Sequence, residues 1–232
     1  MKKLLVLAGL CAALTAGSGP AQAADECDGL MVCVPVAGPW VVVPTAASFP
    51  RPRVEYQLTC PRGYVVGGVD ARLSDRAIDV TIIGRLGSPI NPGITTSRSA
   101  VFVARYVGAT ARSPSFRPFV GCIPSSGGGR IPTAVGAVVK PGEPTIRRVT
   151  VARVRPGSTT VVSACRRNEF LVDVSHAFGF RRAQPPSSTI IGMVSGSRTV
   201  RGQRVLVTAR GDAELGSIRT VVQVHAVCSR VR

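Results

Sequence analysis

The chain has 232 residues, and its 29 lysines and arginines against 12 acidic residues give a formal net charge of +17. Two histidines and few carboxylates leave little material for acid–base or metal chemistry, so an enzyme is not expected. The charge favours anionic partners, but the sequence has no recognition helix or aromatic stacking ladder for sequence-specific binding of nucleic acid.

The first 23 residues have the three parts of a secretory signal peptide. Lys2 and Lys3 precede an apolar run over residues 4–16, and residues 21–23 read Ala-Gln-Ala, the small-x-small pattern of a cleavage site. The apolar run is too short to span a bilayer. We therefore expect a secreted or cell-envelope protein, with no transmembrane segment after the signal is removed.

Residues 24–53 form an apolar N-terminal segment that contains Cys27 and Cys33. Its run MVCVPVAGPWVVVP is apolar enough to pack as a pair of strands, and its three prolines favour a place at the edge of a sheet. A second interpretation gives the segment, with Trp40, a role in docking a strand of a partner protein.

The rest of the chain has the period-two hydrophobic pattern of β-strands. Near the C-terminus Val222 and Val224 share one face of a strand, whereas Gln223 and His225 lie on the other. Valine is abundant, Gly and Pro interrupt the runs, and no amphipathic helix of useful length is present. The pattern predicts an all-β protein of antiparallel β-sandwich units, with a jelly roll or barrel as the alternative.

Two stretches of the chain resemble each other. Each starts with a cysteine, a few polar residues, an aromatic residue and an apolar pair, and each continues through TIIG and a strand-like run to a closing cysteine. The cysteines are 62 residues apart in one stretch and 63 in the other. We read two tandem copies of one unit, at residues 54–124 and 145–232, joined by a linker at 125–144.

Six cysteines remain after the signal, and an even number in an exported chain indicates disulfides. Spacing alone cannot choose among the possible pairings, but the repeat can. The simplest pairing that it allows closes each unit on itself and leaves the N-terminal pair together: Cys60–Cys122, Cys165–Cys228 and Cys27–Cys33. Each long loop would contribute about 4 kcal/mol in the chain-entropy estimate.

The first unit also resembles a known kind of sequence. CPRGYVVGG at residues 60–68, LGSP at 86–89 and VGCIP at 120–124 resemble a recurrent β-rich unit of secreted actinobacterial proteins. The second unit matches less well, because Cys165 is not followed by Pro-x-Gly and the double glycine is missing. The resemblance implies no activity and no site residues.

No constellation of catalytic or metal-binding residues stands out. His225 and Cys228 form a lone HxxC, whereas a zinc site needs about four ligands. Ser175, His176 and Asp173 are near neighbours on one strand, which points adjacent side chains to opposite faces and so disfavours a triad. We predict no catalytic residue, metal or cofactor; a hydrolase built around one of the two histidines is the least favoured alternative.

An acidic cluster also fails as a calcium loop. Asp70, Asp75 and Asp79 lie within ten residues of one another, but the EF-hand spacing and its glutamate are absent, and Arg72 and Arg76 intervene. Ion pairing or ordinary solvation of turns is the expectation.

Arginine is the strongest chemical signal. Without the signal peptide the chain keeps one lysine and 26 arginines against 12 acids, a net charge of 27 − 12 = +15. Guanidinium groups bind phosphate, sulfate and carboxylate through paired hydrogen bonds. The predicted basic surface comprises Arg147, Arg148, Arg153, Arg155, Arg166, Arg167, Arg181 and Arg182.

These features favour a non-catalytic secreted or envelope-associated β-sandwich protein that binds an anionic polymer or a protein partner through arginines. A structural or inhibitor-like protein that binds a partner is the alternative. A third interpretation is that the arginine content only reflects base composition and keeps a β-rich surface in solution.

Overall fold

The computed structural model describes residues 25–30, 32–46, 51–83, 89–91, 94–95, 98–109, 113–125 and 145–230. The predicted signal peptide and all but the first residue of the predicted linker lie outside this set. Every pair of named strands in the described residues is antiparallel. The predicted all-β class with antiparallel sheets is therefore confirmed.

The N-terminal half of the described chain contains β1 (Val34–Ala37), β2 (Trp40–Val42), β3 (Arg53–Thr59), β4 (Tyr64–Leu73), β5 (Ile78–Ile83), β6 (Pro89–Asn91), β7 (Ile94–Thr95), β8 (Ser99–Tyr106) and β9 (Ser115–Pro124). The sheet β3-β8-β5 packs against β4, β9 and β1. Their shared core includes Tyr56, Phe102, Phe116 and Val120, and all four are buried.

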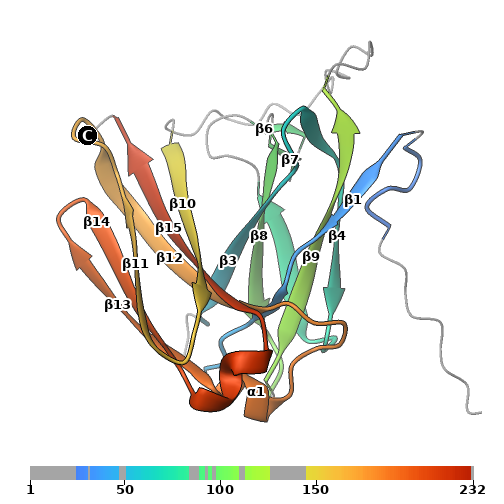
Figure 1. The fold of residues 1–232 in the computed structure, drawn as a ribbon. Coiled ribbons are helices and arrows are strands. Elements are labelled where there is room, and N and C mark those ends of the chain that lie inside the picture. Colours follow the sequence, from blue (N-terminus) through green and yellow to red (C-terminus); the bar gives the residue numbers. More distant parts are fainter. Residues whose placement is uncertain are drawn as a thin grey trace, which may run out of the picture.

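The C-terminal half contains β10 (Thr145–Val154), β11 (Gly157–Ala164), β12 (Phe170–Phe180), α1 (Ser188–Gly192), β13 (Val194–Arg201), β14 (Arg204–Gly211), the short 3₁₀ helix η1 (Ala213–Ser217) and β15 (Thr220–Ser229). The sheet β11-β14-β13 packs against β12-β15-β10. Phe180, Val205, Val207 and Val222 lie in the core between these sheets. Figure 1 shows this half in yellow to red beside the blue-to-green N-terminal half.

Strand β2 joins the two halves into one seven-stranded sheet with the order β1-β9-β2-β12-β15-β10, and β4 lies on the other side of β9. Trp40 at the start of β2 is 1% exposed, and its indole Nε1 donates to the carbonyl of Ala183 at 3.3 Å. Gly179 of β12 lets the residue before β2, Pro39, approach β12 closely, because a Cβ at Gly179 would lie 2.6 Å from Pro39 Cγ. The edge position is confirmed only for β1. The Trp40 indole is internal, and docking of a partner strand by this segment stays a prediction.

The sheet β3-β8-β5 is covered on both faces. Phe102 and Ala104 of β8 face the N-terminal core, and the alternate residues Val101 and Val103 are buried as well. The second face lies toward β15, whose residues are buried along the whole strand. This covering is why Gln223 and His225, on the polar face of an alternating strand, are removed from solvent.

The predicted disulfides are all present: Cys60–Cys122, Cys165–Cys228 and Cys27–Cys33. Each long disulfide connects the residue after the first strand of one sheet (β3 or β11) to the last strand of the facing sheet (β9 or β15). They therefore cross the core of each half between its two layers.

The two halves use the same order of strand pairing. β3-β8-β5 corresponds to β11-β14-β13, and β4-β9-β1 corresponds to β12-β15-β10. Both β4 and β12 have a bulge just beyond the residue that pairs with the disulfide cysteine. One sequence landmark does not correspond: TIIG begins within β5 in the first half but lies in α1 in the second. The interpretation of the chain as a tandem duplication stays a prediction.

Candidate functional site

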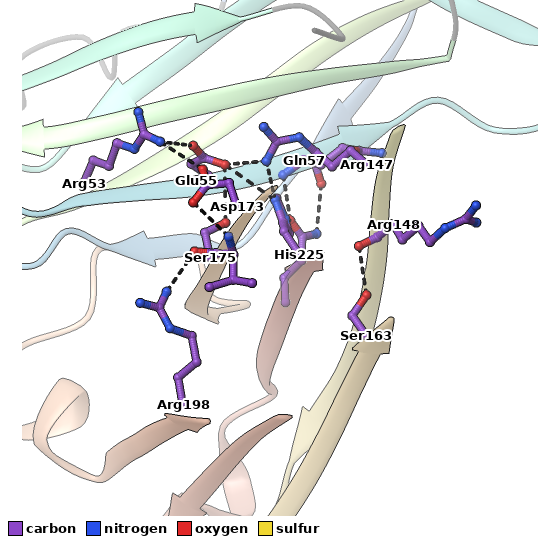
Figure 2. Close-up of polar contacts among 12 residues, drawn as sticks. Arg53, Glu55, Gln57, Arg147, Arg148, Ser163, Asp173, Ser175, Arg198 and His225 are labelled. Atoms are coloured by element: carbon purple, nitrogen blue, oxygen red, sulfur yellow. Dashed lines mark hydrogen bonds and ion pairs between the residues drawn. The ribbon is translucent and has the colours of Figure 1, made fainter. Parts of the chain in front are cut away.

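A buried polar network lies between the halves (Figure 2). Glu55 projects from β3, with its side chain 2% exposed, and forms an ion pair with Arg147 of β10. The same carboxylate accepts from Ser175 Oγ at 3.3 Å, and Arg53 lies 3.5 Å away. Removing this carboxylate from water is costly, so these partners are what make its burial tolerable.

His225 continues the network from β15. The Arg147 guanidinium, which can only donate, lies 2.9 Å from His225 Nδ1, so Nδ1 is the acceptor and the ring is neutral. His225 Nε2 then donates to Gln223 Oε1 at 2.6 Å. Burial, with a further contribution from the Arg147 charge, lowers the pKa of His225 to about 3, in agreement with this tautomer.

Gln223 attaches the network to the backbone of β3. Its amide oxygen accepts from the backbone N–H of Gln57 at 2.6 Å, and its amide nitrogen donates to the carbonyl of Gln57 at 3.0 Å. The side chain thereby makes the pair of hydrogen bonds that a neighbouring strand would make. Together with Glu55, this pairing fixes the sheet β3-β8-β5 against the C-terminal half.

A second buried carboxylate lies near the turn between β11 and β12. Glu169 is fully buried and receives two hydrogen bonds from Arg148, at 2.8 and 2.5 Å. It also accepts the backbone N–H of Arg166 at 2.9 Å. The hydrogen bonds from Arg148 and then Arg166 lower the pKa of Glu169 to about 2.

Two of the arginines predicted to form a basic surface therefore serve inside the molecule. Arg147 is 8% exposed in its side chain and pairs with Glu55, and Arg148 is 23% exposed and pairs with Glu169. Neither guanidinium has its full set of donors available to an external anion.

An open cleft of about 620 Å³ lies beside the network, and its lining includes Arg53, Asp173, Ser175, His176 and Arg198. Its polar residues do not form a catalytic triad. Ser175 donates to Glu55 and Asp173 pairs with Arg53 at 3.1 Å, whereas His176 packs edge-on against the Phe178 ring at 5.7 Å. Each of these three side chains that line the cleft therefore has a different contact partner.

The edge of β12 that borders this cleft is closed to a further strand at Val174. The backbone N–H of Val174 donates to Asp173 Oδ1 at 2.8 Å, and its carbonyl accepts from Arg198 at 2.9 Å. Side chains that occupy edge groups in this way block strand addition. The cleft is therefore a poor site for a partner's β-strand.

The three acids of the predicted turn cluster have separate partners. Asp70 accepts the backbone N–H of Asp25 at 3.1 Å, Asp75 accepts that of Ala77 at 2.8 Å, and Asp79 lies 3.6 Å from Arg105. These contacts give each carboxylate a local role in the fold.

Positive charge is concentrated in the C-terminal half. Residues 145–230 contain 14 arginines and four acids, a balance of 14 − 4 = +10, whereas residues 25–125 contain ten arginines and seven acids, 10 − 7 = +3. Two of the four acids, Glu169 and Asp173, are already bound to arginines. The charge of this half is therefore left largely without internal neutralisation.

Several exposed arginines of this half lie near one or the other end of β15. Four of them lie near the start of β15. The backbone N–H of Arg181 donates there to the carbonyl of Arg219 at 2.9 Å. The neighbouring Arg182 is partly buried and is not counted among the four. The four are Arg153, Arg155, Arg181 and Arg219.

Near the end of β15 a second group surrounds a concavity of about 350 Å³, the arginine pocket, which is lined by Cys165, Arg167, Arg201, Gln203 and Arg204. The predicted basic surface includes Arg167 but not Arg201 and Arg204, which the sequence shows only as part of a local concentration of arginine. The signal that identifies them is the dipeptide Gly202-Gln203, a two-residue hairpin turn that sets its flanking arginines opposite each other.

A potential metal site near this pocket is already occupied by protein groups. Cys165, Glu169 and Cys228 bring their ligand atoms within 4.8 Å of one another. Both sulfurs belong to a disulfide, however, and the carboxylate is held by Arg148. This cluster holds the turn between β11 and β12 in place.

Comparison with protein-family models, with curated proteins and with solved structures found no match. Three disulfides fit a protein that works outside the cytoplasm. Among the residues that the structure describes, no helix is long and apolar enough to cross a membrane.

Proposed function

We propose that this chain is a secreted or envelope-associated, non-catalytic protein that binds anionic polymers through the arginines of its C-terminal half. The observation that carries the proposal is the charge balance of +10 over residues 145–230, against +3 over residues 25–125. A preference for arginine throughout the chain would give both halves a similar positive charge. The difference favours a functional surface on one of them.

The exposed guanidinium groups suit phosphate and sulfate esters. Each offers a planar set of donors that matches two anionic oxygens, and its charge is present at any physiological pH. The groups sit on the β-sheets of the C-terminal half, which are closed by the Cys165–Cys228 disulfide and by the Arg148–Glu169 pair. A surface held in this way loses little conformational entropy on binding, which raises affinity.

Retention on immobilised polyphosphate and on a sulfated polysaccharide tests the proposal. The oxidised mature protein is compared with a basic protein of matched size and net charge across a salt gradient. We expect stronger retention than the control at physiological ionic strength, with an affinity that falls steeply as salt rises because bound counterions are released. Retention equal to that of the control would show that the charge is compositional, and the proposal would fall.

A further inference from the structure

Two of the arginines that line the arginine pocket are direct cross-strand partners. Arg201 and Arg204 are direct partners across the β13–β14 hairpin, on either side of Gly202-Gln203. Gly202 has a φ of +56°, which permits so tight a turn. Like charges directly opposite each other destabilise a strand pair. Within the described residues, neither guanidinium has an acidic partner to offset that repulsion.

A third guanidinium faces this pair from another turn. Arg167 lies between β11 and β12 and lines the same concavity. The backbone N–H of Cys165 donates to the carbonyl of Gln203 at 3.0 Å, which attaches one turn to the other. The Cys165–Cys228 disulfide then fixes both turns to β15.

The turn that carries Arg167 is also held by Glu169. This carboxylate accepts the backbone N–H of Arg166, and the backbone N–H of Glu169 donates to the carbonyl of Arg166 at 3.0 Å. Because Arg148 binds the same carboxylate through two hydrogen bonds, its charge is already matched. Glu169 therefore positions the turn without neutralising the pocket.

We propose that the arginine pocket binds one phosphoryl or sulfo group of the anionic polymer, with Arg167, Arg201 and Arg204 as its ligands. A sulfo group or a terminal phosphoryl group carries three peripheral oxygens and can accept from three guanidinium groups, whereas a carboxylate, like a phosphoryl group inside a polyphosphate chain, has only two. Binding would also relieve the repulsion between the paired arginines of the hairpin. This inference rests on the proposed function and adds to it a location and a ligand chemistry.

Three variants of the mature, oxidised protein test the pocket. R167Q/R201Q/R204Q removes its charges, and R153Q/R155Q/R219Q removes the same number of exposed charges at the opposite end of β15. R167K/R201K/R204K keeps the charge but loses the paired hydrogen bonds that only guanidinium makes. Circular dichroism and thermal unfolding report whether each variant keeps the fold.

Calorimetric titration with sodium polyphosphate and with heparin then measures affinity, and the comparison of the two probes distinguishes a phosphoryl from a sulfo ligand. We expect the pocket glutamine variant to bind the preferred probe at least about tenfold more weakly than the unmodified protein. The distal variant should lose less than about threefold, as expected for long-range charge alone. The lysine variant should recover only part of the loss.

Two results would overturn the assignment of the ligand to the arginine pocket and leave the proposed function standing. One is an equal loss of affinity in the pocket and distal glutamine variants; the other is full affinity in the lysine variant. Either would mean that binding follows total charge. Failure of the unmodified protein to bind either probe more tightly than a matched basic protein at physiological salt would remove the proposed function, and the pocket with it.

Discussion

Protonation of His225 should make the protein sensitive to mild acid. The folded state holds this imidazole neutral, because burial first and the Arg147 charge second lower its pKa from the usual 6.5 to about 3. A pKa that folding depresses contributes stability above the unfolded value, and that contribution is lost as the pH falls toward the folded value. The sensitive window therefore runs from about pH 6.5 down to about pH 3.

The size of the effect follows from that difference. Each pH unit below the unfolded pKa removes about 1.4 kcal/mol of unfolding free energy, so His225 alone should remove about 3 kcal/mol by about pH 4. This is a large share of the stability of an ordinary domain. The change H225Q replaces the ring with an amide that does not titrate, and it removes this contribution to the pH dependence.

Urea unfolding with intact disulfides, at about pH 7 and about pH 4, measures the effect. We expect the unmodified protein to lose about 3 kcal/mol more than H225Q between these two conditions, even though H225Q starts from a lower stability at neutral pH. H176Q is the matched control, because it also replaces one histidine of the same strand pair with glutamine. Burial lowers the pKa of His176 as well, but that ring is only partly buried, so H176Q should reduce the pH dependence less than H225Q does. Equal pH dependence in the unmodified protein and H225Q would refute the neutral, buried imidazole.

Three further changes test the fold. W40A should lower the free energy of unfolding by about 3–5 kcal/mol in the same urea assay, because the indole is fully buried where β2 joins β9 and β12; a loss below about 1 kcal/mol would contradict its place there. C165A/C228A should cost about 4 kcal/mol in the chain-entropy estimate, and unchanged stability would mean that the loop is constrained without the disulfide. E169A should lower the free energy of unfolding by about 2 kcal/mol, because it removes the hydrogen bonds from Arg148. It should also speed amide hydrogen exchange in the β11–β12 turn. Exchange as slow as in the unmodified protein would contradict the role of Glu169 in fixing the turn.

The strands and disulfides were accessible from sequence because their signals are local or repeated. Alternation of side chains depends only on neighbours along the chain, and it predicts β8 and β15 as strands. The near-equal spacing of Cys60–Cys122 and Cys165–Cys228 supplies a pairing that counting cysteines cannot. The TIIG landmark does not mark a strand in the C-terminal half, because Ser187 caps a short helix there and its side chain accepts the N–H of Ile190 at 3.4 Å.

The polar network was not accessible in the same way. Glu55 and Arg147 are 92 residues apart, and Gln57 and Gln223 are 166 apart. No local pattern links them, and the alternation of β15 places Gln223 and His225 on a face that reads as solvent-exposed. Only the packing of the sheet β3-β8-β5 on that face shows that Gln223 and His225 form hydrogen bonds inside the protein. For the same reason sequence alone assigned Arg147 to the surface.

The most direct test of the account is to map the binding surface by NMR. The ¹⁵N-labelled mature protein is titrated with short-chain polyphosphate at physiological ionic strength, and backbone amide and arginine Nε–Hε signals are followed. We predict that signals of Arg167, Arg201, Gly202 and Arg204 shift first and saturate together. Equal shifts at every exposed arginine, or earlier saturation at the end that carries Arg153, would contradict it.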